Sequence, residues 1–182
     1  KYRAELEVYR GVAEGLPAVI LNPGGILGPG ANWDKGTPGI IKKVDEGLSV
    51  YVDSMSGLVG VTDVAAAAWM LLRSSMEKGE RFILVGENWP QKRLLDTLAE
   101  LLGKPKPWIK LPSFLLLLAG RLFELRGNLT NKEPFISVES ARSASGSHAY
   151  DGSAIEDVGL AYTPISTTLK RTVAAYVEQR KD

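Results

Sequence analysis

The sequence predicts an α/β fold with a doubly wound parallel sheet and a smaller, mostly helical part. Two continuous apolar runs, at residues 18–21 and 81–85, are typical of parallel strands that are covered on both faces. Each run follows a helix-like or turn segment, which is the alternation expected in such a sheet. Two buried strands with a few short ones cannot complete a sheet, so we expect part of the fold to lie outside these 182 residues.

The composition excludes several classes of function. The chain holds 22 basic and 21 acidic residues, for a net charge of +1, so no strong field attracts nucleic acid or an anionic membrane. It has no cysteine, which excludes disulfides and thiolate sites and is compatible with a cytoplasmic location. His148 is the single histidine. We therefore expect no metal site, because a zinc ion would need mainly carboxylate ligands.

No segment is predicted to cross a membrane. The most apolar run, Leu111–Gly120, is followed at once by Arg121 and is well short of the roughly 20 residues that a span needs. Charged residues also interrupt the N-terminal segment, which is unlike a signal peptide. We expect the apolar run to belong to a helix over residues 113–126, in which Leu115, Leu118 and Leu122 face the core or a substrate. Binding to a membrane surface is the alternative.

The first predicted element is a helix over residues 1–14, which ends at Gly15 because glycine tolerates a left-handed C-cap. No Ser, Thr, Asp or Asn precedes Lys1 as an N-cap, so we expect that natural sequence lies upstream. The strand at 18–21 follows, and it leads into a glycine- and proline-rich loop at 22–30. Ligands bind beyond the carboxyl ends of strands in open α/β sheets, so this loop is the first candidate site.

Short elements follow the loop. We predict a helix over 39–46 and strands over 48–52 and 58–61. Asp63 then stands before an alanine- and leucine-rich helix over 64–72. An acidic residue in that place favours an N-cap over a catalytic acid.

After the strand at 81–85, the pattern predicts an amphipathic helix over 91–102 that is closed by Gly103. Three prolines forbid a helix in the next stretch, which is an extended linker or an edge strand. The remaining predicted helices are 113–126, 133–147 and 166–179.

Several segments match one protein family in their order and spacing. They are KYRAELEVYR, VILNPGGILGPGANW, GLVGVTDVAAA, GERFILVGEN, AELLGK and AYDGSAIEDVGLAYTPIS. The chain resembles the extended short-chain dehydrogenase/reductases, in the branch of dihydroflavonol-reductase-like proteins and NAD-dependent epimerase/dehydratases. The resemblance is to the C-terminal part of such a protein only.

The family's fold is the Rossmann-like doubly wound parallel sheet with a small, mostly helical substrate domain. The resemblance implies that residues 1–103 are the C-terminal part of the Rossmann-like domain with interleaved substrate-domain segments. Residues 104–182 are then mainly the small substrate-binding domain and the terminal helices.

The resemblance implies a catalytic role for Lys1. In the family, a tyrosine lies four residues before a lysine on one helix, so that both side chains share a face. That tyrosine would precede the first residue here. The ammonium favours the phenolate of a tyrosine whose unperturbed pKa is near 10, and it can hydrogen-bond the nicotinamide ribose. A solvated surface charge is the alternative interpretation of Lys1.

The loop after the first strand matches the family segment that packs beside the nicotinamide, where glycine lets the backbone approach a flat ring. A plain turn is the alternative. The implied cofactor is NAD or NADP, although the main cofactor-binding motif is not in this chain. The implied cofactor-binding residues are Lys1, Pro23, Gly24, Gly25, Ile26 and Thr37, and Trp33 is the implied wall of the substrate site.

Several other residues are expected to be structural. His148 is expected at the surface rather than as a base. Tyr150 and Asp151 are expected to act in packing and in a turn. Two positions depart from the family pattern: Gly60 is expected to loosen its strand, and Ala154 stands where the family often has a lysine.

The resemblance implies the C-terminal portion of an NAD(P)-dependent oxidoreductase or epimerase for a carbonyl or hydroxyl substrate, of the dihydroflavonol or nucleotide-sugar type. The implied partners are a small-molecule substrate, the N-terminal half of the same polypeptide and a second copy of the chain. We expect the isolated chain to be inactive, since it has no site for the adenine half of the cofactor. The alternative is a non-catalytic NAD(P)-binding protein that senses redox state or serves as a scaffold.

Overall fold

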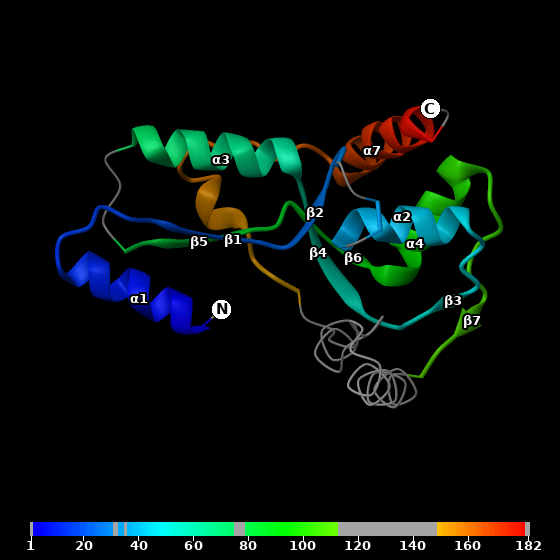
Figure 1. Ribbon diagram of the computed structural model, residues 1–182, viewed down its shortest axis with the longest axis horizontal. Coiled ribbons are helices and arrows are strands. Elements are labelled where there is room, and N and C mark those ends of the chain that lie inside the picture. Colours follow the sequence, from blue (N-terminus) through cyan, green and yellow to red (C-terminus); the bar gives the residue numbers. More distant parts are fainter. Residues whose placement is uncertain (1, 31–32, 35, 75–78, 113–148, 181–182) are drawn as a thin grey trace.

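The computed structural model describes residues 2–30, 33–34, 36–74, 79–112 and 149–180 (Figure 1). Lys1, His148 and the predicted helices at 113–126 and 133–147, with their three leucines, lie outside the described residues. Within the described residues, no helix is long and apolar enough to cross a bilayer.

The described helices follow the predicted order. The helix α4 spans residues 91 to 102 as predicted, and Gly103 ends it at a left-handed φ of 65°. Helix α2 begins three residues earlier than predicted, and α3 begins at the residue predicted to end a strand. A 3-10 turn, η1, was not predicted. The elements are α1 (Tyr2–Ala13), α2 (Gly36–Asp45), α3 (Val61–Arg73), α4 (Gln91–Leu102), η1 (Ser153–Ile155) and α7 (Ile165–Gln179).

The strands confirm a parallel α/β fold. Strand β1 pairs with β5, β2 with β4 and β3 with β7, all parallel, and β6 adds to β4 in the antiparallel sense. Sequence reasoning missed β2 and β6, which lie in the glycine-rich loop and in a segment without an apolar run. The strands are β1 (Ile20–Pro23), β2 (Gly25–Leu27), β3 (Val50–Tyr51), β4 (Met55–Gly60), β5 (Arg81–Leu84), β6 (Glu87–Pro90) and β7 (Ile109–Lys110).

Helices lie on both sides of the strands, as in a doubly wound sheet. Helix α3 covers one side of the β1–β5 pair and α1 lies on the other, while α2, α4 and α7 gather around β2, β4 and β6 (Figure 1). Two apolar clusters reflect this arrangement. One joins α3 and η1 to β4 and β5, and the other joins α2, α4 and α7 to β2, β4 and β6.

Strand β1 is less buried than the sequence predicts. Ile20 and Leu21 are half-buried and Pro23 is exposed, although both faces of the strand were expected to be covered. Among the described residues β5 is its only strand neighbour, so the other edge of β1 has no partner there. An apolar groove of about 530 Å³, lined by Ala18, Leu21, Ala68 and Leu72 among others, lies between β1 and α3.

The prediction that Asp63 caps a helix is wrong. Helix α3 already begins at Val61, its N-cap is Gly60, and no side chain caps it. The buried Asp63 carboxylate instead accepts hydrogen bonds from the backbone N–H and the hydroxyl of Thr163, at 2.9 and 2.8 Å. Gly60 makes room for this contact, because a Cβ there would lie 3.2 Å from Asp63 Oδ2. The glycine thus admits a tether between α3 and the segment before α7 rather than loosening a strand.

A second polar tether is formed by Asp45, the last residue of α2, with α7 and with the segment that follows α4. Its carboxylate accepts a hydrogen bond from the Tyr176 hydroxyl at 3.0 Å, and it forms ion pairs with Lys104 and Arg180. Burial alone would raise the pKa of Asp45, but the hydrogen bonds from Tyr176 and Lys104 and the charge of Arg180 together lower it. Burial, and then the bond to Asp45, raise the pKa of Tyr176.

Replacing Asp45 with asparagine is expected to lower the free energy of unfolding at pH 7 by about 1–2 kcal/mol, because a charged hydrogen-bond acceptor is lost. The pKa of the Asp45 carboxyl is lowered in the folded state. Its contribution to the free energy of unfolding is therefore complete above the pKa of the unfolded chain, about 3.9, and is lost as the pH falls through the pKa of the folded protein. Urea unfolding of wild type and Asp45→Asn at pH 7 and pH 3 measures this difference.

Asp53→Asn is the matched control, because the Asp53 side chain is 76% exposed in its pair with Lys110 and contributes little. If the free energies of unfolding of wild type and Asp45→Asn differed by the same amount at both pH values, the stabilising role of the ionised Asp45 carboxylate would be contradicted.

Candidate functional site

A cavity of about 580 Å³ lies where β1 ends and β2 begins. Strands β1, β2, β4 and β5 and helices α2 and α4 contribute residues to it, and Tyr150 joins them from the segment after residue 148. Apolar side chains make most of the wall. The lining residues are Asn22, Pro23, Gly24, Gly25, Thr37, Ile40, Met55, Ser56, Gly57, Leu58, Arg81, Ile83, Val85, Leu94 and Tyr150.

The cavity brings together four of the predicted cofactor-binding residues. Pro23, Gly24 and Gly25 come from the end of β1 and the start of β2, and Thr37 comes from the first turn of α2. A Cβ on Gly25 would lie 3.6 Å from the Thr37 hydroxyl oxygen, so these two positions are neighbours in space. The strand-end segment and the helix after it thus form one wall.

Close backbone packing explains the glycine at position 24. A Cβ built on Gly24 would lie 2.5 Å from the carbonyl oxygen of Gly57. The backbone N–H of Gly24 donates a hydrogen bond to the carbonyl oxygen of Leu84 at 3.0 Å. Gly57 is restricted in the same way, since its Cβ would approach the Val85 side chain at 2.9 Å and the Tyr150 ring at 3.1 Å. The two glycines let the chain after β1 approach the middle of β4 at the cavity.

Two predicted site residues do not line this cavity. Ile26 packs against the apolar cluster beneath α3. Trp33 packs edge-on to Tyr176 with ring centroids 5.0 Å apart, and its indole N–H donates to Gln179. The structure therefore places Trp33 against α7.

Sequence reasoning missed the other residues that line the cavity. Met55, Ser56 and Gly57 of β4 line the cavity, and so does Tyr150, which was expected only to pack. The Asn88 side chain of β6 fixes Tyr150, because it donates to the Tyr150 carbonyl at 2.8 Å and accepts the Tyr150 N–H at 3.0 Å. This link spans 62 residues, so no local pattern could have shown it.

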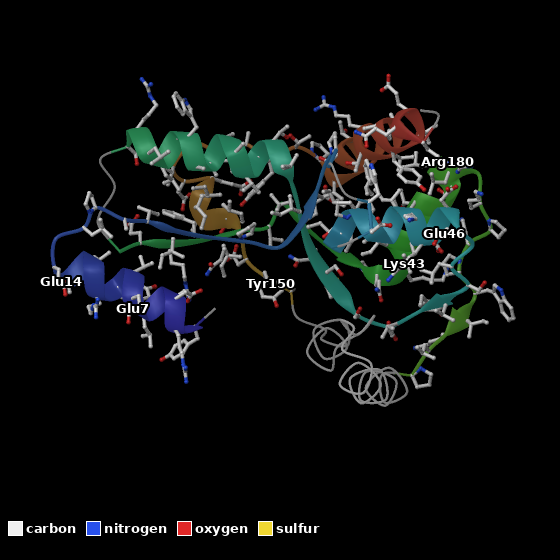
Figure 2. The ribbon with its side chains drawn as sticks, in the orientation of Figure 1. Glu7, Glu14, Lys43, Glu46, Tyr150 and Arg180 are labelled. Carbon is white, nitrogen blue, oxygen red and sulfur yellow. The ribbon has the colours of Figure 1, made fainter. Side chains whose placement is uncertain are left out.

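Hydrogen bonds also fix the turn that follows Tyr150. Asp151 accepts a hydrogen bond from the Ser153 N–H at 2.9 Å, and this bond lowers the pKa of Asp151, which confirms the predicted turn role. The Tyr162 hydroxyl donates to the Gly152 carbonyl at 3.1 Å, and burial raises the pKa of Tyr162. Figure 2 shows Tyr150 at the start of this segment, beneath the strands.

The charge at the cavity is low. Arg81 is the single charged residue among its described lining residues, and its guanidinium lies 3.7 Å from the Glu5 carboxylate of α1. The described polar groups are Asn22, Thr37, Ser56 and Tyr150. These groups can orient a ligand by hydrogen bonding, and the glycine-lined floor admits a flat ring.

No family model matches the chain. A dihydroflavonol 4-reductase-like protein of Synechocystis is 29% identical over 181 residues, which cover 95% of this chain and 52% of that protein. The solved structure of a nucleoside-diphosphate-sugar epimerase from Pseudomonas aeruginosa superposes with a TM-score of 0.75 at 24% identity, over 98% of this chain and 54% of that one. The chain resembles dihydroflavonol-reductase-like and epimerase/dehydratase proteins. The similarity covers the C-terminal part of the larger proteins.

The chain spans about half the length of the curated relatives that it matches, 52% for the Synechocystis protein. A dTDP-glucose 4,6-dehydratase of Streptomyces venezuelae, solved with NAD bound, has the same fold at 18% identity and a TM-score of 0.67, over 97% of this chain and 49% of that one. Another structure of this fold holds NADPH. The predicted resemblance and the Rossmann-like fold class are confirmed.

Proposed function

We propose that this chain is the C-terminal portion of an NAD(P)-dependent oxidoreductase or epimerase that acts on a carbonyl or hydroxyl group. The cavity carries this proposal, because it gathers Pro23, Gly24, Gly25 and Thr37 at the carboxyl end of β1. The similarity to reductase-like and epimerase proteins, and NAD or NADPH in structures of the same fold, support it.

The residues present fit the nicotinamide half of such a cofactor. The floor of the cavity has no Cβ at Gly24, Gly25 or Gly57, and at Gly24 a Cβ would overlap the neighbouring backbone. Backbone without side chains suits a flat ring, and Pro23, Gly24, Gly25 and Thr37 are the residues that would hold it. When bound, the nicotinamide would accept or supply a hydride.

Lys1 is the proposed catalytic residue of this chain. Its ammonium would lower the pKa of a tyrosine phenol and hydrogen-bond the nicotinamide ribose, so that the hydroxyl proton of the substrate can be exchanged. The structure places Trp33 and Ile26 outside the cavity, and their predicted roles in the substrate and cofactor sites stay predictions. The proposed division of the chain stays a sheet part, residues 1–103, and a substrate part, residues 104–182.

The proposed partners are a small-molecule substrate, the N-terminal half of the same polypeptide and a second copy of the chain. The unpaired edge of β1 supports the proposed N-terminal half. The outer face of α1 supports a homodimer, since Tyr2, Leu6 and Tyr9 are 73%, 47% and 38% exposed on one side of the helix. We place the protein in the cytoplasm.

Two experiments on the full-length protein test the proposal. The first titrates it with NADH and NADPH and follows cofactor fluorescence. The second measures turnover with aryl ketones and nucleotide sugars. Saturable cofactor binding with turnover is the expected result. Binding without any turnover would favour the non-catalytic alternative, and absence of binding by either cofactor would overturn both. The isolated 182-residue chain is expected to oxidise neither cofactor.

A further inference from the structure

Helix α1 meets the sheet along one narrow face. Its half-buried residues are Glu5, Val8, Gly11 and Val12, which have the spacing of a single helix face, and none of its described residues is buried. Near the C-terminal end of α1, a Cβ on Gly79 would lie 3.2 Å from Val12 Cγ1, just before β5. The described part of the chain therefore covers α1 on one side only, beside the β1–β5 pair (Figure 1).

Glu5 is the charged member of this face. Its carboxylate lies 3.7 Å from the guanidinium of Arg81 at the start of β5, and the Glu5 and Arg81 side chains are 29% and 49% exposed. The other ion pairs of α1 in the described part join Arg10 to Glu7 and Glu14 within the helix. Among the described residues, the pair of Glu5 with Arg81 is thus the ionic link between α1 and the sheet.

This link lies at the candidate site. Arg81 lines the cavity at the carboxyl end of β1 and is the single charged residue among its described lining residues. In the sequence, Lys1 stands four positions before Glu5, the spacing of two residues that share a helix face. A contact that fixes the rotation of a helix at one residue also fixes the direction in which a residue one turn away projects.

We propose that Glu5 and Arg81 are positioning residues for the catalytic role proposed for Lys1. Their ion pair holds the N-terminal turns of α1 against the cavity wall, so that the lysine is directed toward the reacting tyrosine phenol. An ion pair of this exposure contributes little to stability, but a displacement of about 1 Å at a catalytic group can lower a rate roughly 100-fold. The inference rests on the proposed function and adds these two residues to it.

Steady-state turnover by the full-length protein tests this assignment, with acetophenone plus NADPH in one assay and UDP-glucose in another. On the faster substrate, Glu5→Gln and Arg81→Met are each expected to lower kcat about tenfold. Arg81→Lys keeps a cation and should retain about a third or more of the wild-type kcat. Glu7→Gln is the matched control, because it removes a carboxylate that is 67% exposed on the same helix, and it should react as wild type does.

The pH dependence of kcat separates positioning from a direct effect of charge. Glu5→Gln removes a negative charge, which by itself would favour the phenolate and lower the pH at which kcat reaches half of its maximum. Displacement of the lysine has the opposite effect, because the phenol loses the cation that lowers its pKa. We therefore expect this pH to rise in Glu5→Gln, and a fall or no change would overturn the proposal.

The double variant shows whether the two residues act as one unit. Glu5→Gln combined with Arg81→Met should lower kcat no further than either single variant, because each already removes the pair. Additive losses in the double variant, or a wild-type rate in Glu5→Gln, would overturn the proposal alone. Absence of wild-type turnover of both substrates would overturn the proposed function and this inference with it.

Hydrogen exchange of the full-length protein gives a readout that needs no turnover. The backbone amides of α1 should exchange roughly threefold faster in Glu5→Gln and Arg81→Met than in wild type, because the helix is held less firmly to β5. Glu7→Gln should leave the exchange unchanged. Equal exchange in all of these proteins would show that the ion pair does not hold α1, and the positioning role would be abandoned.

Discussion

Replacing Gly24 with alanine is expected to destabilise the protein by about 2–3 kcal/mol, the upper range for overpacking a closely packed site. The new Cβ would lie 2.5 Å from the Gly57 carbonyl oxygen and 3.0 Å from its carbonyl carbon. The closest of these atoms are backbone, so relief requires β1 and β4 to move apart rather than a side chain to rotate. Both glycines line the cavity, and we expect NAD(P)H binding to weaken as well.

Urea unfolding at pH 7 measures the stability change, and Gly25→Ala is the matched control. A Cβ on Gly25 would meet the terminal Cδ2 of Leu58 at 3.2 Å, and this side chain can rotate. We expect the control to lose less than half as much stability as Gly24→Ala. Equal losses for the two variants would show that the backbone contact with Gly57 does not decide the requirement for glycine.

If the proposed function holds, replacing Lys1 with methionine is expected to lower kcat of the full-length protein by about 100-fold or more, the usual contribution of acid–base catalysis. Methionine has a similar length but no charge, so the tyrosine phenol would keep a pKa near its ordinary value of about 10. Less phenolate would then form at neutral pH. The pH at which kcat reaches half of its maximum should accordingly rise.

Steady-state rates from pH 6 to pH 10 test this expectation, with Lys170→Met as the control. Lys170 lies on an exposed position of α7, and its replacement should change kcat little. Retention of more than a third of the wild-type kcat by Lys1→Met would mean that Lys1 is a surface charge, and the proposed catalytic role would be abandoned.

Local patterns predicted much of the fold. Helix α4 has the predicted bounds because its apolar spacing and its closing Gly103 are signals within one short segment. Strand β5 carries a run of apolar residues and lies within one residue of its predicted range. Strand β2 was missed because Gly25 and the glycines on either side of the strand favour a turn locally, and its pairing with Leu58 to Gly60 of β4 makes it a strand.

The role of Asp63 shows the limit of the same reasoning. An acidic residue near a helix start suggests a cap, and Asp63 does lie in the first turn of α3. Its partner, Thr163, lies 100 residues away in the sequence. A carboxylate offers its oxygens to whichever donor the fold brings near, so only the packed structure could identify the tether.

For the candidate site, too, part was predictable from the sequence and part depends on tertiary contacts. The sequence by itself determined the α/β class and the glycine-rich segment at the end of β1, because apolar runs and glycine positions are local signals. The resemblance to a family, rather than a local pattern, singled out Pro23, Gly24, Gly25 and Thr37, and their role stays a prediction. Only the tertiary structure decided that Trp33 packs on α7 and that Tyr150 reaches the cavity. The physical reason is that the contact of Asn88 with Tyr150 depends on which distant segments the strands bring together, and no residue pattern near either position records it.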